Sequence, residues 1–189
     1  MNLLVVSNLY PPQELGGYGR SIADFVWGLQ ERGHSIQVLS SDAPNLGPSS
    51  EIGPSGEPVD RRLKLKGSYE GGVRPLHDPQ QRQAIDQANA NLIRAFLNRQ
   101  QWDGILLGNL DLLGPELLPS LLDAACIVQH HVGFVHAPFP PSAWPKSDRY
   151  KLVGASKAVR SALVHCGLPA STAKVVYPGV RNELFGEER

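Results

Sequence analysis

Residues 2–33 read NLLVVSNLYPPQELGGYGRSIADFVWGLQERG, and this stretch decides the fold. Residues 3–6 are short and continuously apolar, which is typical of a strand buried on both faces of a parallel sheet. Two prolines then end the strand. From Ser21 onward, apolar residues recur at helical spacing, and Gly33 is placed to end that helix. The stretch therefore predicts a strand, a loop and a helix, followed by a second strand over residues 34–40.

A parallel strand pair joined by a helix crosses over right-handedly, so the loop lies at the carboxyl edge of the sheet, where open α/β folds bind ligands. Gly16, Gly17 and Gly19 lack side chains and precede a helix N-terminus, where backbone N–H groups and the helix dipole favour an anion. The alternative is steric, with the glycines only letting the helix pack closely on the strand. We favour a phosphate site.

The nicotinamide fingerprint fits this loop poorly. It needs three glycines in the order Gly-x-Gly-x-x-Gly close to the strand. Here Ile22 occupies the third glycine position, although Asp42 after the second strand is suitable for a ribose. We therefore place a nicotinamide-binding oxidoreductase behind the other hypotheses.

Two motifs carry a family resemblance. Residues 8–17, which include tyrosine-proline-proline and a glycine pair, and residues 29–39, which include arginine-glycine-histidine, resemble the amino-terminal segment of glycosyltransferase family 4. The resemblance implies the GT-B architecture, retaining transfer from a nucleotide-diphosphate sugar, and contact of Gly16 and Gly17 with the donor diphosphate. It implies no catalytic metal and no cofactor besides the donor substrate.

Composition sets limits on the protein class. The chain has 189 residues, 18 basic and 18 acidic, which suits one α/β domain and gives no electrostatic case for nucleic acid. Two cysteines are too few for a disulfide framework, so we expect a cytoplasmic protein. We expect no signal peptide and no spanning helix. Peripheral contact with a membrane is left open.

The rest of the chain alternates strands and helices, which predicts a Rossmann-like, doubly wound, mostly parallel sheet with helices on both faces. Residues 42–60 are expected to be a mobile loop and residues 133–149 an irregular aromatic loop. Further expected strands lie at 59–65, 102–108, 125–129, 150–155 and 174–177. Expected helices lie at 78–100, with a buried stripe that includes Ala88, at 113–124, and at 156–166, where Ser156 caps.

His130 and His131 follow a predicted buried strand. Strand periodicity points their rings to opposite faces, so one at most faces the cleft. The resemblance favours His131 as the catalytic residue, bonding the substrate near the scissile bond or assisting proton transfer. A structural role is the alternative. A metal pair is disfavoured because the two side chains diverge.

Three residues are predicted to contact the acceptor: Tyr18, Arg20 and Asn109. The resemblance places an amino-terminal, acceptor-side domain over residues 1–176 and the start of an interdomain linker over residues 177–189. Arg181 departs from the family, which usually has aspartate there. The family's second, donor-binding domain has no counterpart here, so we expect this piece to be inactive alone. A nucleotide- or carbohydrate-binding module without transferase activity is the alternative.

Overall fold

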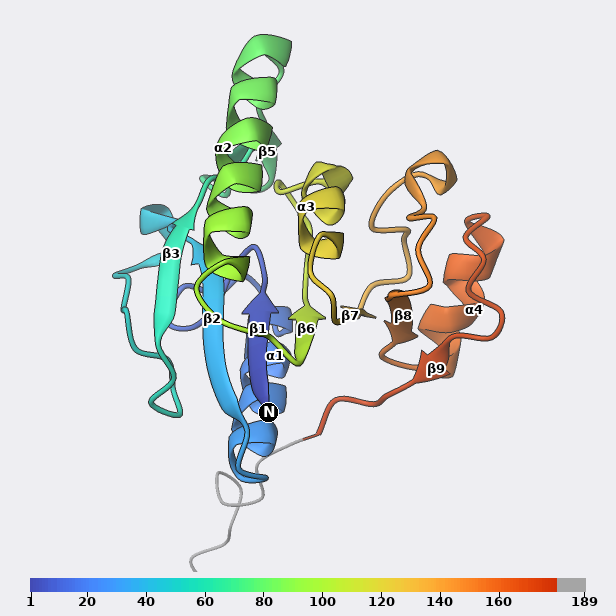
Figure 1. Cartoon of the computed structure of the whole chain (residues 1–189). Coiled ribbons are helices and arrows are strands. Elements are labelled where there is room, and N and C mark those ends of the chain that lie inside the picture. Colours follow the sequence, from blue (N-terminus) through green and yellow to red (C-terminus); the bar gives the residue numbers. More distant parts are fainter. Residues whose placement is uncertain (180–189) are drawn as a thin grey trace, which may run out of the picture.

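The computed structural model describes residues 1–179, and its centre is a parallel seven-stranded sheet (Figure 1). The strand order is β3-β2-β1-β6-β7-β8-β9, and every neighbouring pair is parallel. The predicted Rossmann-like α/β fold is confirmed. The strands are β1 (Asn2–Val6), β2 (Ser35–Ser41), β3 (Val59–Leu63), β6 (Gly104–Leu107), β7 (Ile127–Val132), β8 (Tyr150–Gly154) and β9 (Lys174–Val175).

The four α-helices within residues 1–179 divide unequally between the two faces of the sheet. They are α1 (Tyr18–Gln30), α2 (Pro79–Leu97), α3 (Leu118–Leu122) and α4 (Lys157–His165). Ile22 and Val26 of α1 pack with Val5 on one face. The other three helices contribute to a larger core on the opposite face, around Leu4 and Val6. None of the described helices combines the length and apolarity needed to cross a membrane.

Crossover handedness explains this asymmetry. The β1–α1–β2 unit moves one way along the sheet, whereas β6, β7, β8 and β9 follow one another in the opposite direction. Right-handed connections then place α1 on one face and the later helices on the other. The order reverses between β1 and β6, which makes their carboxyl ends the topological switch point where such sheets bind ligands.

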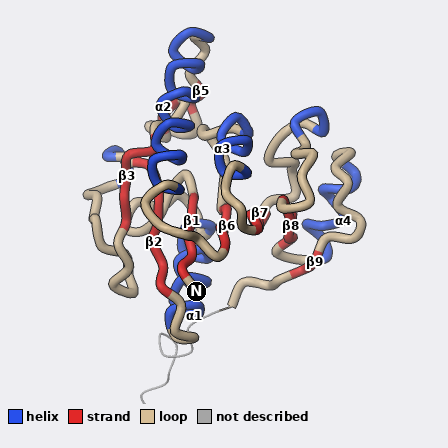
Figure 2. Tube along the Cα trace, viewed as in Figure 1, coloured by secondary structure: helices blue, strands red, loops and turns tan. Residues whose placement is uncertain are grey.

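Short elements and the loops drawn in tan in Figure 2 complete the described part of the chain. β4 (Gly67–Ser68) and β5 (Arg74–Pro75) form a separate hairpin, which the sequence did not predict. Three 3₁₀ turns occupy Pro44–Leu46, Pro115–Leu117 and Pro141–Ala143. The second of these turns replaces the first part of the helix expected over residues 113–124, because prolines at 115 and 119 remove backbone donors.

Several predicted element boundaries and one buried position differ from the structure. Helix α1 begins at Tyr18 rather than Ser21. Strand β7 continues to Val132, so both histidines lie inside it. In α2 the expected stripe is wrong at Ala88, which is exposed, because Asn89 is buried instead and bonds the N–H and carbonyl of Lys64, each at 2.8 Å. Position 181 lies outside the described residues.

Candidate functional site

The glycine loop, residues 14–20, presents open backbone at the carboxyl end of β1. Gly16 adopts a left-handed φ of 69° and is exposed, and Gly17 forms the N-cap of α1 without a side-chain capping bond. The first helical bond joins the Ser21 N–H to the Gly17 carbonyl (3.0 Å), so the amides of residues 18–20 have no acceptor within the helix. A Cβ added at Gly16 or Gly17 would meet nothing within 4 Å. The loop can therefore admit an anion.

Gly19 differs from its two neighbours. It is buried, and a Cβ there would lie 3.6 Å from the Leu9 carbonyl oxygen. This spacing is ordinary van der Waals contact, so Gly19 serves the close approach of α1 to the strand end. The steric interpretation thus suits Gly19, whereas Gly16 and Gly17 leave space for a ligand.

Polar side chains and carbonyls after β2 anchor residues 10–13, the segment that leads into the glycine loop. Arg61 donates to the carbonyls of Tyr10 (3.0 Å) and Pro11 (2.6 Å), and the Tyr10 hydroxyl donates to the buried Glu57 carboxylate. Gln13 donates to Asp42 at 2.7 Å. Residues 42–60 were expected to be a mobile loop, but they contact the loop that follows β1 through these bonds. No helical or strand pattern in the sequence predicts that Glu57 and Arg61 make these contacts.

Tyr18 and Arg20 point in different directions from the start of α1. Arg20 is exposed and pairs with Glu14 at 2.9 Å. Tyr18 turns inward: its hydroxyl donates to the His131 carbonyl, and its ring stacks on Phe134 with centroids 5.2 Å apart. Burial, assisted by the negative charge of Asp111, raises the Tyr18 pKa well above its ordinary value. Contact of Tyr18 and Arg20 with an acceptor stays a prediction.

The histidine pair separates across the sheet, as strand periodicity predicts. His130 packs on the larger core, where its Nδ1 lies 2.7 Å from the Tyr150 hydroxyl. Complete burial lowers the pKa of His130 to about 3, and the nearby His131 adds to this effect. A neutral ring bonded to Tyr150 in the core indicates a structural role for His130.

His131 lies on the α1 face, in edge contact with Phe25 at 4.8 Å between centroids. Its Nε2 is 3.2 Å from the Val176 carbonyl, which can only accept, so Nε2 carries the proton. Its Nδ1 is buried without a hydrogen-bond partner among the described residues. Burial lowers the His131 pKa, so this nitrogen is a neutral acceptor. The residue is 1% exposed, and a catalytic role for it stays a prediction.

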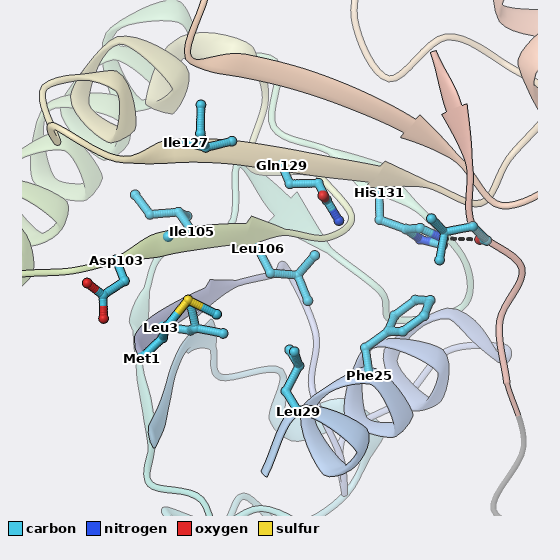
Figure 3. Close-up of a pocket in the computed structure, with 12 residues that line it drawn as sticks. Met1, Leu3, Phe25, Leu29, Asp103, Ile105, Leu106, Ile127, Gln129 and His131 are labelled. Carbon is cyan, nitrogen blue, oxygen red and sulfur yellow. Dashed lines mark hydrogen bonds between the residues drawn. The ribbon is translucent and has the colours of Figure 1, made fainter. Parts of the chain in front are cut away.

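His131 also lines an apolar groove of about 310 Å³ (Figure 3). The groove extends along the α1 face of β1, β6 and β7, and Figure 3 shows Met1 and Asp103 at one end and Phe25 with His131 at the other. It lies on a part of the sheet that the single helix α1 does not cover. It is therefore distinct from the glycine loop and is not the predicted donor site.

Asn109 follows β6 at the same edge as the glycine loop. Its amide donates to the Asp111 carboxylate at 3.0 Å, and the Asp111 N–H donates to the Asn109 amide oxygen at 3.1 Å. The structure thus brings Asn109 close to Asp111, a residue that the sequence did not single out. Within residues 1–179, no three side chains of His, Cys, Asp or Glu gather as metal ligands.

The reversed strand order, with an uncapped helix N-terminus beside it, defines a Rossmann-like α/β domain. The fold is similar to HepE from Anabaena in complex with UDP (TM-score 0.64, 16% identity), covering 98% of this chain and 46% of that one. It is also similar to MurG from Acinetobacter baumannii (TM-score 0.56, 12% identity), covering 96% and 47%.

The family assignment comes from sequence. The model for Glycosyltransferase Family 4 matches residues 15–184, and the chain belongs to this family. A UDP-N-acetylglucosamine 2-epimerase from Neisseria meningitidis shares the fold as well (TM-score 0.54, 12% identity, covering 93% and 45%). No curated protein matches the chain. The chain spans less than half the length of these structures.

Proposed function

We propose that this chain is the acceptor-side domain of a retaining glycosyltransferase that moves a sugar from a nucleotide-diphosphate donor to an acceptor. The observation that carries the proposal is the open glycine loop at the switch point, with the free amides of residues 18–20 and the space above Gly16 and Gly17. Family membership supports the reaction class. The HepE structures with UDP and with UDP-glucose support the donor class.

The domain does only part of this work. Transfer requires donor and acceptor held together while the leaving diphosphate is stabilised. The glycine loop supplies amides to the diphosphate from the acceptor side, and it supplies no site for a base and ribose. We therefore propose that a second, donor-binding domain completes the enzyme and that residues 1–189 alone do not turn over. Donor, acceptor and loop need no metal in this scheme.

The first test is to sequence the gene beyond the codon for residue 189. We expect it to encode a second nucleotide-binding domain there. The encoded protein is then assayed for nucleotide release from a panel of UDP-, GDP- and ADP-sugars with a mixture of sugar acceptors. We expect acceptor-dependent release with at least one donor, and none from residues 1–189 alone. Tight donor binding without any release would instead support a binding module that lacks transferase activity.

A further inference from the structure

The last part of the described chain, residues 176–179, turns back from the edge strand β9 towards α1 (Figure 1). We call these residues the exit segment. Tyr177 and Gly179 line a hollow of about 370 Å³ together with residues of α1, among them Phe25 and Leu29. The exit segment therefore lies on the α1 side of the sheet.

Two hydrogen bonds hold the exit segment, and both are made by Val176. Its N–H donates to the carbonyl of Gly154 at the end of β8 (3.0 Å), and its carbonyl accepts from Nε2 of His131 (3.2 Å), the bond drawn as a dashed line in Figure 3. Within residues 1–179, the exit segment makes no other hydrogen bond. His131 is thus the one side chain in this part of the protein that donates to it.

The imidazole of His131 is enclosed on the strand. It packs edge-on against Phe25 of α1, with ring centroids 4.8 Å apart, and the residue is buried. Burial lowers the pKa of His131, so the ring is neutral, and its single proton lies on Nε2 because the Val176 carbonyl can only accept. Nδ1 is buried and has no partner among the described residues. One nitrogen is therefore used by the exit segment, and the other is closed to a substrate.

The buried Nδ1 atom indicates what this position requires. A buried acceptor without a partner lowers the stability of a fold. A methionine, which is apolar and of similar length, would avoid that loss, but it would leave the Val176 carbonyl without its donor. Donation of the Nε2 proton to the exit segment is therefore the property of imidazole that the fold uses here.

We infer that His131 is a positioning residue, which fixes the point where the chain leaves this domain by holding the exit segment on the sheet. Its own backbone carbonyl accepts from the hydroxyl of Tyr18, which directly follows Gly17 of the glycine loop. The exit segment and the start of α1 are thus attached to the same residue. Under the proposed function, on which this last step rests, His131 also places the donor-binding domain relative to the glycine loop.

NMR spectroscopy of the 189-residue chain tests the attachment. Long-range ¹H–¹⁵N spectra should show the His131 proton on Nε2, with a scalar coupling from Nε2 to the carbonyl carbon of Val176. His131→Met should speed hydrogen exchange of the Val176 amide by about threefold to tenfold, the effect of losing one hydrogen bond. His131→Gln should leave this exchange close to that of the parent, because its amide nitrogen is a donor as many bonds from Cβ as Nε2 is.

His77→Met and His77→Gln, at an exposed histidine, are the matched controls and should not change the exchange of Val176. A proton on Nδ1 of His131, or equal exchange of the Val176 amide in His131→Met and His131→Gln, would overturn the assignment. The tautomer is read from the parent chain, so it decides the question even if a variant does not fold.

Turnover of the longer protein, measured as nucleotide release, distinguishes positioning from catalysis. His131→Met should lower turnover severalfold, and His131→Gln should restore most of it. If the His131 ring transferred a proton in the reaction, both variants would instead lose about 100-fold or more, and the positioning role would be overturned. Absence of turnover even from the parent would defeat the proposed function and the placement of a second domain, whereas the exchange of Val176 would still decide the attachment.

Discussion

Helices α1 and α4 both begin at the carboxyl edge of the sheet after a parallel strand, yet their N-termini are built differently. Ser156 caps α4, its hydroxyl accepting from the Val159 N–H at 3.1 Å. Gly17 at the corresponding position of α1 offers no side chain, and bonds of Glu57 and Arg61 with Tyr10 anchor the segment that precedes the loop. The side chain at the capped end satisfies one of the first-turn amides, whereas no side chain caps an amide at the start of α1.

Blocking the open end gives the largest expected effect. In the longer protein, Gly17→Val should lower turnover by about 100-fold or more, the range seen when an enzyme loses an anion-binding donor. Gly17 has ordinary helical backbone angles (φ −90°, ψ −2°) and free space around it, so the fold should survive. Nucleotide release measures the turnover of this variant, and thermal unfolding measures its stability.

Gly28→Val is the control for that variant, because a Cβ there would meet only the end of the Arg32 side chain, at 3.5 Å. Its turnover should stay close to that of the parent. Gly17→Val with parental turnover would show that the two helix ends do not differ in function.

Removing Arg61, which anchors the segment before the glycine loop, has the next largest expected effect. Arg61→Ala should lower the free energy of unfolding by about 2–3 kcal/mol, because three backbone carbonyls lose a charged donor. The neighbouring Arg62 is exposed, pairs with Asp60 and lies 5.8 Å from the centre of the Phe96 ring, so Arg62→Ala should cost only about 1 kcal/mol. Urea unfolding compares them, and equal losses would contradict the anchoring role.

The buried His130, on the α4 side of the sheet, extends the comparison to pH. Its folded pKa of about 3 lies below the ordinary value of about 6.5. The neutral ring therefore makes its full contribution to the free energy of unfolding above about pH 6.5, and this contribution declines as the pH falls below that value. Between about pH 6.5 and pH 5 the loss should be about 2 kcal/mol. His130→Asn should flatten this dependence in urea unfolding, and the exposed His77→Gln should not.

Removing the cap of α4 has the smallest expected effect. Ser156→Ala should lower the free energy of unfolding by about 1 kcal/mol, the usual loss for an N-cap hydroxyl. Turnover of the longer protein should not change. Thermal unfolding of Ser156→Ala and of the parent measures the loss of stability. A loss of turnover in Ser156→Ala would show that the N-terminus of α4 also takes part in the reaction.

Local patterns predicted much of the fold. The apolar run of β1 and the caps Asp78 and Ser156 are found as predicted, because each depends on neighbours within a few residues. The opposite orientations of His130 and His131 follow from strand geometry alone. The glycine loop was found for the same reason, since its chemistry is that of one turn and one helix end.

What local patterns missed depends on contacts between distant segments. Glu57 and Arg61 contact the segment before the glycine loop from about fifty residues away, and nothing in their own surroundings indicates this. Asp111 lies beside Tyr18 and Gly133 only because β6 and β7 are neighbours. The inward turn of Tyr18 likewise requires the carbonyl of His131, at the end of a strand more than a hundred residues later.

Tyr18 and His131 together link two ends of the domain. The Tyr18 hydroxyl bonds the His131 carbonyl, and the His131 ring bonds the Val176 carbonyl. His131 therefore connects the first turn of α1 to the segment that follows β9. Because one residue of β7 contacts both, the start of α1 and the segment after β9 share an attachment to the sheet.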